Sequence, residues 1–485
     1  MITLFLSIIA LILGYVFYSR VVERVFGVDN TRKTPALTMA DGVDYVVMPW
    51  WKIFLIQFLN IAGLGPIFGA VAGAMWGPVA FLWIVLGSIF AGGVHDYFSG
   101  MLSIKHKGES ITEISGRYLG TGVKQFMRGF SVILMVMVGA VFIMGPARIL
   151  AQMTGFPGGV TLWVWVVFIY YIFSTILPID KLIGKVYPVF GFALIFMAVG
   201  IFTMMVAGGL PIPELTMANL TNLHHQAERF PIFPMLFITI ACGAISGFHA
   251  TQSPLMARCM TRESQGRSIF YGAMITEGVV ALIWAAIAMS FFGGVGEFNG
   301  VMALNQNNAA LVVNEISNSL LGRVGGFLAL LGVVAAPITS GDTAFRSARL
   351  IVADFMKFKQ GPIKNRLLVS LPLFVVGFLL TMVDFGIIWR YFAWSNQTLG
   401  TIVLWTITAY LIQERKLFWI TLLPATFMTA VVTSYLLIAP ESFGLSGEIA
   451  YGAGISTALL LFLIALVSAS RVKVRGEKEK AVLVK

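Results

Sequence analysis

Residues 60–78 read NIAGLGPIFGAVAGAMWGP and place Gly63, Gly65 and Pro66 in the middle of a long apolar run. Glycine and proline both destabilise the interior of a helix. The run belongs to a predicted span of residues 47–76, which is too long for one straight crossing, because a helix needs about 20 residues to span the hydrocarbon core. The stretch therefore predicts a membrane helix that is broken near its middle.

A second stretch has the same character. Residues 241–254 read ACGAISGFHATQSP, in which Gly243, Gly247 and Pro254 interrupt another apolar run. An unwound segment inside a membrane frees backbone N–H and C=O groups, and paired breaks of this kind are typical of transporter binding sites. The alternative is that the glycines only allow helices to pack closely.

The whole chain has the composition of a membrane protein. Of its 485 residues, 58% are hydrophobic and 11% are charged, and the mean hydropathy is +0.88, whereas a soluble domain carries about 25% charged residues. Backbone groups in lipid must be hydrogen-bonded internally, which leaves helices or closed barrels, and the apolar runs are longer than the roughly 10-residue strands of a barrel. We therefore expect an all-α polytopic membrane protein.

The apolar runs predict about 13 transmembrane helices. Their expected bounds are 2–18, 47–76, 79–104, 127–153, 160–177, 188–208, 232–256, 269–293, 325–356, 367–384, 391–412, 417–438 and 450–470. Most of the 33 Lys and Arg residues fall in alternate loops, which predicts an inner-membrane protein with its N-terminus outside and its C-terminus in the cytoplasm. The net charge of +11 is then a topology signal and does not indicate nucleic acid.

The two predicted breaks are five helices apart, so two groups of five helices enter the membrane from opposite faces. We therefore expect a five-plus-five inverted repeat with extra helices around it. The expected segments are a first helix with a cytoplasmic loop (1–46), the first repeat (47–208), the inverted second repeat (232–412), and two additional helices with a basic cytoplasmic tail (417–485).

Five motifs resemble those of the carbon starvation protein (CstA) family. They are ADGVDY (40–45), IAGLGPIFGAVAGAMWG (61–77), GGVHDYFSG (92–100), SGFHATQSP (246–254) and TSGDTAFRSARL (339–350). The resemblance runs from about residue 20 to about residue 415. It implies an inner-membrane transporter of peptides or pyruvate during nutrient limitation, with the five-plus-five fold of transporters such as LeuT. The chain departs from the family in being shorter and in having Ile56 and Gln57 where the family has a His-His pair.

Polar residues at the two breaks are the candidates for substrate binding, because polar groups inside a membrane are costly. Gln57 and Asn60 flank the first break, and at the second His249 could donate to a substrate carboxylate or carry a proton. The full set is Gln57, Asn60, Gly63, Gly65, Ser246, His249 and Gln252. The amide side chains could instead cap a kink, and His249 could be a hydrogen-bonded structural histidine.

Charged residues form a second group of candidates. His95 and Asp96 lie in one predicted helix, where Asp96 is expected either to transfer a proton or to pair with Arg117 or Lys105 as a structural lock or gate. Glu277 is an isolated acid in an apolar span. It suits a proton carrier, unless a neighbouring group simply satisfies it.

Asp342, Arg346 and Arg349 share one face of a predicted helix, and the spacing of the first two favours an intrahelical ion pair. By resemblance to the five-plus-five transporters, Thr339 and Ser340 imply a sodium site or its vestige, with Asp342 able to take a proton instead. The expected coupling ion is a proton. Its candidate carriers, in order, are His249, Asp342 and Glu277, with sodium at Thr339 and Ser340 as the alternative.

These features predict a secondary active transporter that imports a small polar metabolite, such as a short peptide, an amino acid or a pyruvate-like carboxylate, with a proton gradient. The alternatives are a sodium-coupled carrier of the same substrates and a channel. The sequence holds no nucleophile with a base, and Cys242 and Cys259 form no ligand-spaced motif. We therefore expect no enzyme, no metal and no cofactor. The expected partners are the substrate and the lipid bilayer, and the sequence leaves the oligomeric state open.

Overall fold

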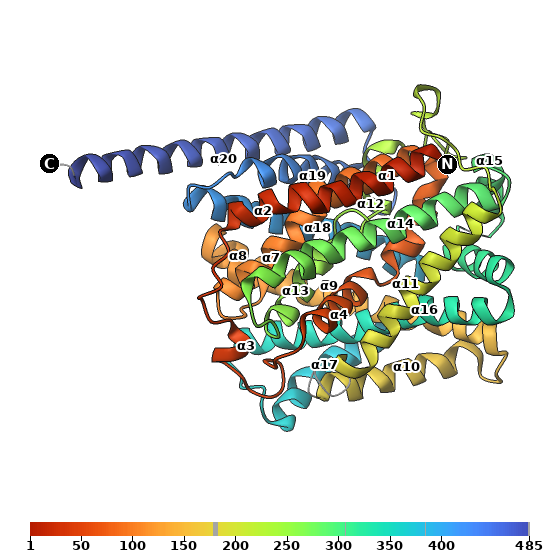
Figure 1. Ribbon diagram of the computed structural model, residues 1–485, viewed down its shortest axis with the longest axis horizontal. Coiled ribbons are helices and arrows are strands. Elements are labelled where there is room, and N and C mark those ends of the chain that lie inside the picture. The colour runs from red at the N-terminus through yellow and green to blue at the C-terminus, as the bar shows by residue number, and fades with distance from the viewer. Residues whose placement is uncertain (178–182, 306, 384, 484–485) are drawn as a thin grey trace.

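The computed structural model describes residues 1–177, 183–305, 307–383 and 385–483, and every regular element in these ranges is a helix (Figure 1). The all-α expectation is confirmed. The first half contains α1 (Ile2–Leu13), α2 (Ser19–Phe26), α3 (Pro35–Thr38), α4 (Trp50–Ala62), α5 (Ala70–Gly73), α6 (Val79–Leu86), α7 (Gly93–Lys105), α8 (Ile111–Leu119), α9 (Thr121–Thr154), α10 (Gly159–Ile176) and α11 (Ile183–Ala207).

The second half contains α12 (Phe237–Thr239), α13 (Gly247–Ala257), α14 (Gly272–Phe291), α15 (Val295–Leu304), α16 (Ala309–Met356), α17 (Ile363–Leu380), α18 (Phe385–Gln413), α19 (Trp419–Ile438) and α20 (Gly447–Leu483). Short π-helical turns continue several of them, as at Gly14–Tyr18, Gly65–Gly69 and Gly87–Gly92. The helix α16 changes direction at Gly322, which has a φ of 62°.

The protein is a multi-pass membrane protein. Within the described ranges, eight helices are long and apolar enough to cross a membrane, or nine if a bent pair counts as one span. The number of about 13 spans stays a prediction, as do the orientation and the four segment boundaries. The predicted end of one span at residue 384 lies outside the described residues.

The first predicted break is present. The helix α4 ends at Ala62, and the next helical turn begins at Gly65 after a bend of 51°. Gly63 lies between them with φ 32° and ψ −136°, a backbone conformation that residues other than glycine rarely adopt. The glycine therefore allows the chain to change direction at this point.

The second break lies slightly earlier than the sequence suggested. The chain leaves helical geometry at Ile240, passes through an irregular segment, and re-enters a helix at Gly247. Ser246 is extended, with φ −148° and ψ 127°. Pro254, which was expected to contribute to the break, instead lies inside α13. The break is thus formed by residues 240–246.

The helices on either side of the breaks form the centre of the bundle. The helix α4 packs against α11, α13, α14 and α16, and α9 packs along α16. The last two helices are more peripheral, since α20 packs mainly on α19 and extends past the other helices toward the C-terminus (Figure 1).

The two breaks lie directly against each other. A Cβ atom built on Gly65 would lie 2.1 Å from Cβ and 2.5 Å from Sγ of Cys242. On the opposite side, a Cβ atom on Gly243 would come within 3.9 Å of the backbone of Pro66. The absence of a side chain at Gly65 therefore allows this close approach.

We predict that Gly65→Ala destabilises the protein by about 1–3 kcal/mol, because an added methyl group at a packed site forces its neighbours to move. Gly129→Ala is the matched control, since Gly129 is an exposed helical glycine with open space around its Cβ position. This control should be neutral or slightly stabilising. Thermal unfolding of both variants in detergent tests the prediction, and equal midpoints would contradict it.

Candidate functional site

The first break receives a hydrogen-bond donor from another helix. The hydroxyl of Ser340, on α16, donates to the carbonyl oxygens of Leu59 at 3.1 Å and Asn60 at 2.8 Å. These carbonyls belong to the last turn of α4, where the C=O groups have no N–H partner within their own helix. Ser340 therefore ties α16 to the first break, and it does so at the position where the sequence pointed to sodium.

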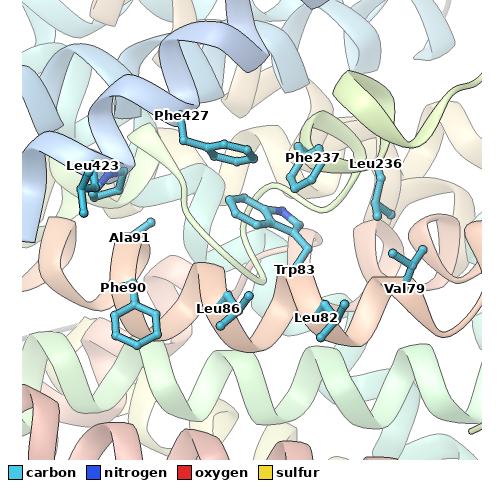
Figure 2. Close-up of a pocket in the computed structure, with 11 residues that line it drawn as sticks. Val79, Leu82, Trp83, Leu86, Phe90, Ala91, Leu236, Phe237, Leu423 and Phe427 are labelled. Atoms are coloured by element: carbon cyan, nitrogen blue, oxygen red, sulfur yellow. The ribbon is translucent and has the colours of Figure 1, made fainter. Parts of the chain in front are cut away.

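The second break is held by side chains from the first half of the chain. The indole Nε1 of Trp83 donates to the carbonyl of Ile240 at 3.0 Å, and the hydroxyl of Ser88 donates to that of Gly243 at 2.9 Å. Figure 2 shows Trp83 between α6 and the aromatic rings of Phe237 and Phe427. Trp83 and these two rings line an apolar pocket of about 500 Å³.

Asn396, on α18, caps the helix that follows the second break. Its Oδ1 accepts from the backbone N–H of Phe248 at 2.7 Å and from the hydroxyl of Ser246 at 3.0 Å. This residue was not among the sequence candidates. The only signal for it was the polar run of Ser395, Asn396 and Gln397 inside an otherwise apolar helix.

Four titratable side chains form a buried chain next to this break, in which one of the three links is longer than a hydrogen bond. Nδ1 of His95 lies 2.8 Å from Asp96 Oδ1, and Nδ1 of His249 lies 2.9 Å from Asp96 Oδ2. On its other side, Nε2 of His249 lies 3.6 Å from Oε2 of Glu277. All four side chains have no solvent exposure. They come from α7, α13 and α14, so three separate helices meet at His249.

The lock expected for Asp96 is wrong. Its predicted partners bind other acids. Nε of Arg117 donates to Glu109 Oε2 at 2.8 Å, and Nζ of Lys105 donates to Glu414 Oε1 at 2.8 Å. Both basic residues lie near solvent, where long side chains can reach an acid and remain hydrated. Asp96 is deeper in the bundle, and its partners are the two imidazoles.

Cys242 lies beside this chain. Its Sγ, a ring nitrogen of His249 and a carboxylate oxygen of Glu277 lie within 4.8 Å of one another. Sulfur, nitrogen and oxygen are donor types that bind zinc, but the sulfur ligand must be a thiolate. Here the Cys242 thiol donates a hydrogen bond to Ser246 at 3.5 Å. The same sulfur accepts from Nδ2 of Asn396 at 3.8 Å, so both hydrogen-bond partners of Cys242 are protein groups at the second break.

The amide side chains of the predicted substrate set are also buried in the two broken helices. Gln57 Nε2 lies 3.4 Å from the Ser253 hydroxyl, and Gln252 Nε2 lies 2.9 Å from the Thr251 hydroxyl. In the part of the chain that the structure describes, several polar atoms of this set have no hydrogen-bond partner. They are Gln57 Oε1, Asn60 Nδ2 and Oδ1, Gln252 Oε1 and His249 Nε2. Such groups can bind a polar ligand or water.

Thr339, Ser340 and Asp342 diverge although they are close in sequence. The Thr339 hydroxyl bonds its own helix at the Ala336 carbonyl, whereas Ser340 reaches the first break. Asp342 accepts hydrogen bonds from Ser174 on α10 and Tyr187 on α11. The structure therefore separates Asp342 from the histidine chain.

The intrahelical pair expected between Asp342 and Arg346 is wrong. Nη1 of Arg346 instead donates to Asp44 Oδ1 at 3.1 Å, and Nη2 donates to the carbonyls of Ser174 and Leu177. Nη2 of Arg349 lies 3.2 Å from the same oxygen of Asp44. Arg346 therefore pairs with Asp44, which lies in a distant loop, and does not pair with Asp342, which is one turn away on the same helix.

Asp44 lies in the loop between α3 and α4, outside the membrane helices. Burial by itself would raise the pKa of its carboxyl, but the guanidinium groups of Arg349 and Arg346 lower that pKa to about 2. Asp44 belongs to the ADGVDY motif, but no role followed from the sequence alone. Its two arginine partners could not be identified without the fold.

The fold and the buried polar site define the class of protein. The structure of MhsT in complex with L-phenylalanine matches this chain with a TM-score of 0.56 and 13% identity, over 87% of this chain and 99% of that one. This match shows the LeuT-like fold. Together with the relatives described below, it makes the chain a multi-pass membrane transporter.

The family model for carbon starvation protein CstA matches residues 1–161 and 148–324, and the chain belongs to this family. An uncharacterized membrane protein of Haemophilus influenzae is 44% identical over 60% of this chain and 91% of its own length. The peptide transporter CstA of Bacillus subtilis is 26% identical over 88% of each chain. That of Campylobacter jejuni is 25% identical over 87% of this chain and 78% of its own.

We predict that Asn396→Ala costs about 1–3 kcal/mol of stability, because it leaves the buried N–H of Phe248 without its acceptor. Thr398→Ala is the matched control on the same helix, since the Thr398 hydroxyl bonds the Trp394 carbonyl one turn away and no other group among the described residues. Hydrogen–deuterium exchange at residues 246–249 should rise in the first variant and stay unchanged in the second. Unchanged exchange in both would contradict the capping role.

Proposed function

We propose that the protein imports a small carboxylate-bearing metabolite together with protons, and that the buried chain from His95 through Asp96 and His249 to Glu277 carries the proton. This chain is the observation that supports the proposal. A buried ionisable group in a membrane helix is costly and is a functional candidate by default. Four such groups next to one another, at a helix break, form a route for a proton that has one gap, between His249 and Glu277.

His249 has the central position in this route. Its Nδ1 faces the Asp96 carboxylate and its Nε2 faces Glu277, so the imidazole can exchange a proton with either side. The distance of 3.6 Å to Glu277 is longer than a hydrogen bond. A small movement of α13 toward α14, or one bridging water, would complete the connection.

The helices that carry these groups also explain how a proton could drive transport. His249 is on the broken helix α13, whereas Asp96 and Glu277 are on α7 and α14. A movement of α13 changes the contacts of His249 and therefore its affinity for a proton. A proton that binds one conformation more tightly shifts the population toward it. Proton binding and alternating access are then linked.

The substrate class follows from the groups that surround the breaks. The N-terminus of α13 lies inside the bundle, where the helix dipole favours a negatively charged group. The unpartnered Nδ2 of Asn60 adds a donor group, and Oδ1 of Asn60 and Oε1 of Gln57 add two acceptors, for a peptide or keto group. The relatives named as peptide transporters are consistent with short peptides, and amino acids or pyruvate-like acids carry the same carboxylate.

We predict that Glu277→Gln and His249→Ala reduce proton-driven uptake of pyruvate or dialanine into proteoliposomes to the level of protein-free vesicles. Glu277→Gln should still exchange internal for external substrate, because it removes the proton carrier and leaves the amide groups in place. His106→Ala is the control, since His106 lies at the edge of the bundle on Tyr118. Proton-driven accumulation that survives both substitutions would overturn the proposal.

A sodium-coupled mechanism is the second candidate, because Ser340 contacts the carbonyls of the first break. Under the proton proposal, Ser340→Ala costs about 1–3 kcal/mol of stability but leaves the ion dependence of uptake unchanged. Thr203→Val is the control, since Thr203 is an exposed threonine on α11 whose hydroxyl donates to the carbonyl of Val199 in its own helix. Uptake that requires sodium at a fixed proton gradient, and loses this requirement in Ser340→Ala, would move the coupling to sodium.

A further inference from the structure

One end of the bundle holds more buried positive charge than the acids there balance. Arg346 and Arg349 are fully buried, and both contact the single carboxylate of Asp44. Arg258 is also buried, and it faces Asp354 and Asp41 as well as Asp44, so the excess positive charge lies at Arg346 and Arg349. Two guanidinium groups that share one carboxylate leave a net positive charge in a region with little water, which is unfavourable unless an anion visits it.

The contacts within this cluster are incomplete. The distances from Asp44 to the two arginines are 3.1–3.3 Å, whereas good charge-assisted bonds measure about 2.7–2.9 Å. Nε of Arg346 and Nε of Arg349 have no hydrogen-bond partner among the described residues. Each guanidinium can therefore offer a further donor to an incoming anion.

The position of Asp44 in the chain would allow its carboxylate to move away from the two arginines. It lies on the irregular loop between α3 and α4, in a turn held by Asp41, whose Oδ1 accepts from the N–H groups of Val43, Asp44 and Tyr45. The arginines, by contrast, are on the long helix α16. The acid can move as part of its loop while the bases stay in place.

The arginines follow the central site along the same helix. Arg346 is six residues beyond Ser340, a rise of about 9 Å along α16. Directly after Arg346, the Ser347 hydroxyl donates to the carbonyl of Thr251 on α13 at 3.0 Å. A small cavity of about 10 Å³ lies beside Ser347 and is lined by Thr251, Arg258 and several apolar side chains. Ser347 thus links the helix that follows the second break to the segment of α16 that carries the arginines.

We propose that Arg346 and Arg349 form a second substrate site, which binds the carboxylate of the transported molecule in place of Asp44. Asp44 occupies this site when the substrate is absent and is displaced when the carboxylate arrives from the breaks. The site lies at the end of the bundle predicted to be cytoplasmic, so it would receive the substrate before release. The inference rests on the proposed function in requiring a carboxylate-bearing substrate.

Binding of pyruvate to the full-length protein in nanodiscs, measured by calorimetry, tests the proposal. In the wild type the ligand must displace Asp44, and this competition weakens the apparent affinity. Asp44→Asn removes the competing charge, so pyruvate should bind about tenfold more tightly or better. The neutral analogue pyruvamide should show no gain, because it lacks the carboxylate that the arginines recognise.

Two further variants identify the groups responsible. Adding Arg349→Gln to Asp44→Asn should abolish the gain in affinity, whereas Arg117→Gln removes a surface arginine that pairs with Glu109 and should change nothing. If Asp44→Asn does not fold, Arg349→Lys keeps the charge and loses the planar fork of donors. It should raise the KM for pyruvate uptake with little change in stability.

An unchanged affinity in a folded Asp44→Asn variant, or a gain that survives Arg349→Gln, would reject the second site. The binding measurement uses no ion gradient, so its outcome is independent of proton coupling. Failure of Glu277→Gln to alter uptake would therefore reject the proposed function alone, and failure of Asp44→Asn to alter binding would reject the second site alone.

Discussion

The structure depends on how the backbone at two interrupted helices is hydrogen-bonded inside a membrane. Unpaired N–H and C=O groups cost several kcal/mol each in hydrocarbon, so irregular backbone persists only where protein groups satisfy it. Here the donors and acceptors come from distant helices. Ser340 on α16 donates to carbonyls of the first break. At the second break, Trp83 on α6 donates to a carbonyl and Asn396 on α18 accepts from an N–H group. The breaks therefore hold the bundle together as well as interrupting it.

Because side-chain hydrogen bonds stabilise the two breaks, the helices that end there can also move. A helix end that is held by one or two side-chain hydrogen bonds can exchange them for others at modest cost, since a hydrogen bond contributes only about 0.5–1.5 kcal/mol net. Gly65 and Cys242 bring the two breaks into contact without a bulky side chain between them. In the described arrangement the central polar groups Asn60, Ser246 and His249 are buried.

Two electrostatic systems surround this centre and have opposite sign. Near the second break, the acids Asp96 and Glu277 flank the imidazole of His249. Farther along α16, Arg346 and Arg349 surround the carboxylate of Asp44. The first system is the proton route that we propose, and the second is the carboxylate site that we propose. Their separation along one bundle allows a proton and a carboxylate to be bound by different groups.

The sequence by itself determined the all-α class, the two breaks and most of the buried polar residues. An apolar composition requires membrane helices, and glycine and proline destabilise a helix at the positions where they occur, so neither effect depends on distant parts of the chain. Only the tertiary structure decided which polar groups meet. His249 contacts Asp96 across 153 positions, and Arg346 contacts Asp44 across 302 positions. Local spacing favoured Asp342 for Arg346, and charge alone favoured Arg117 or Lys105 for Asp96. Both expectations failed because an ion pair depends on distance in space, and helix packing sets that distance between segments that the sequence keeps far apart.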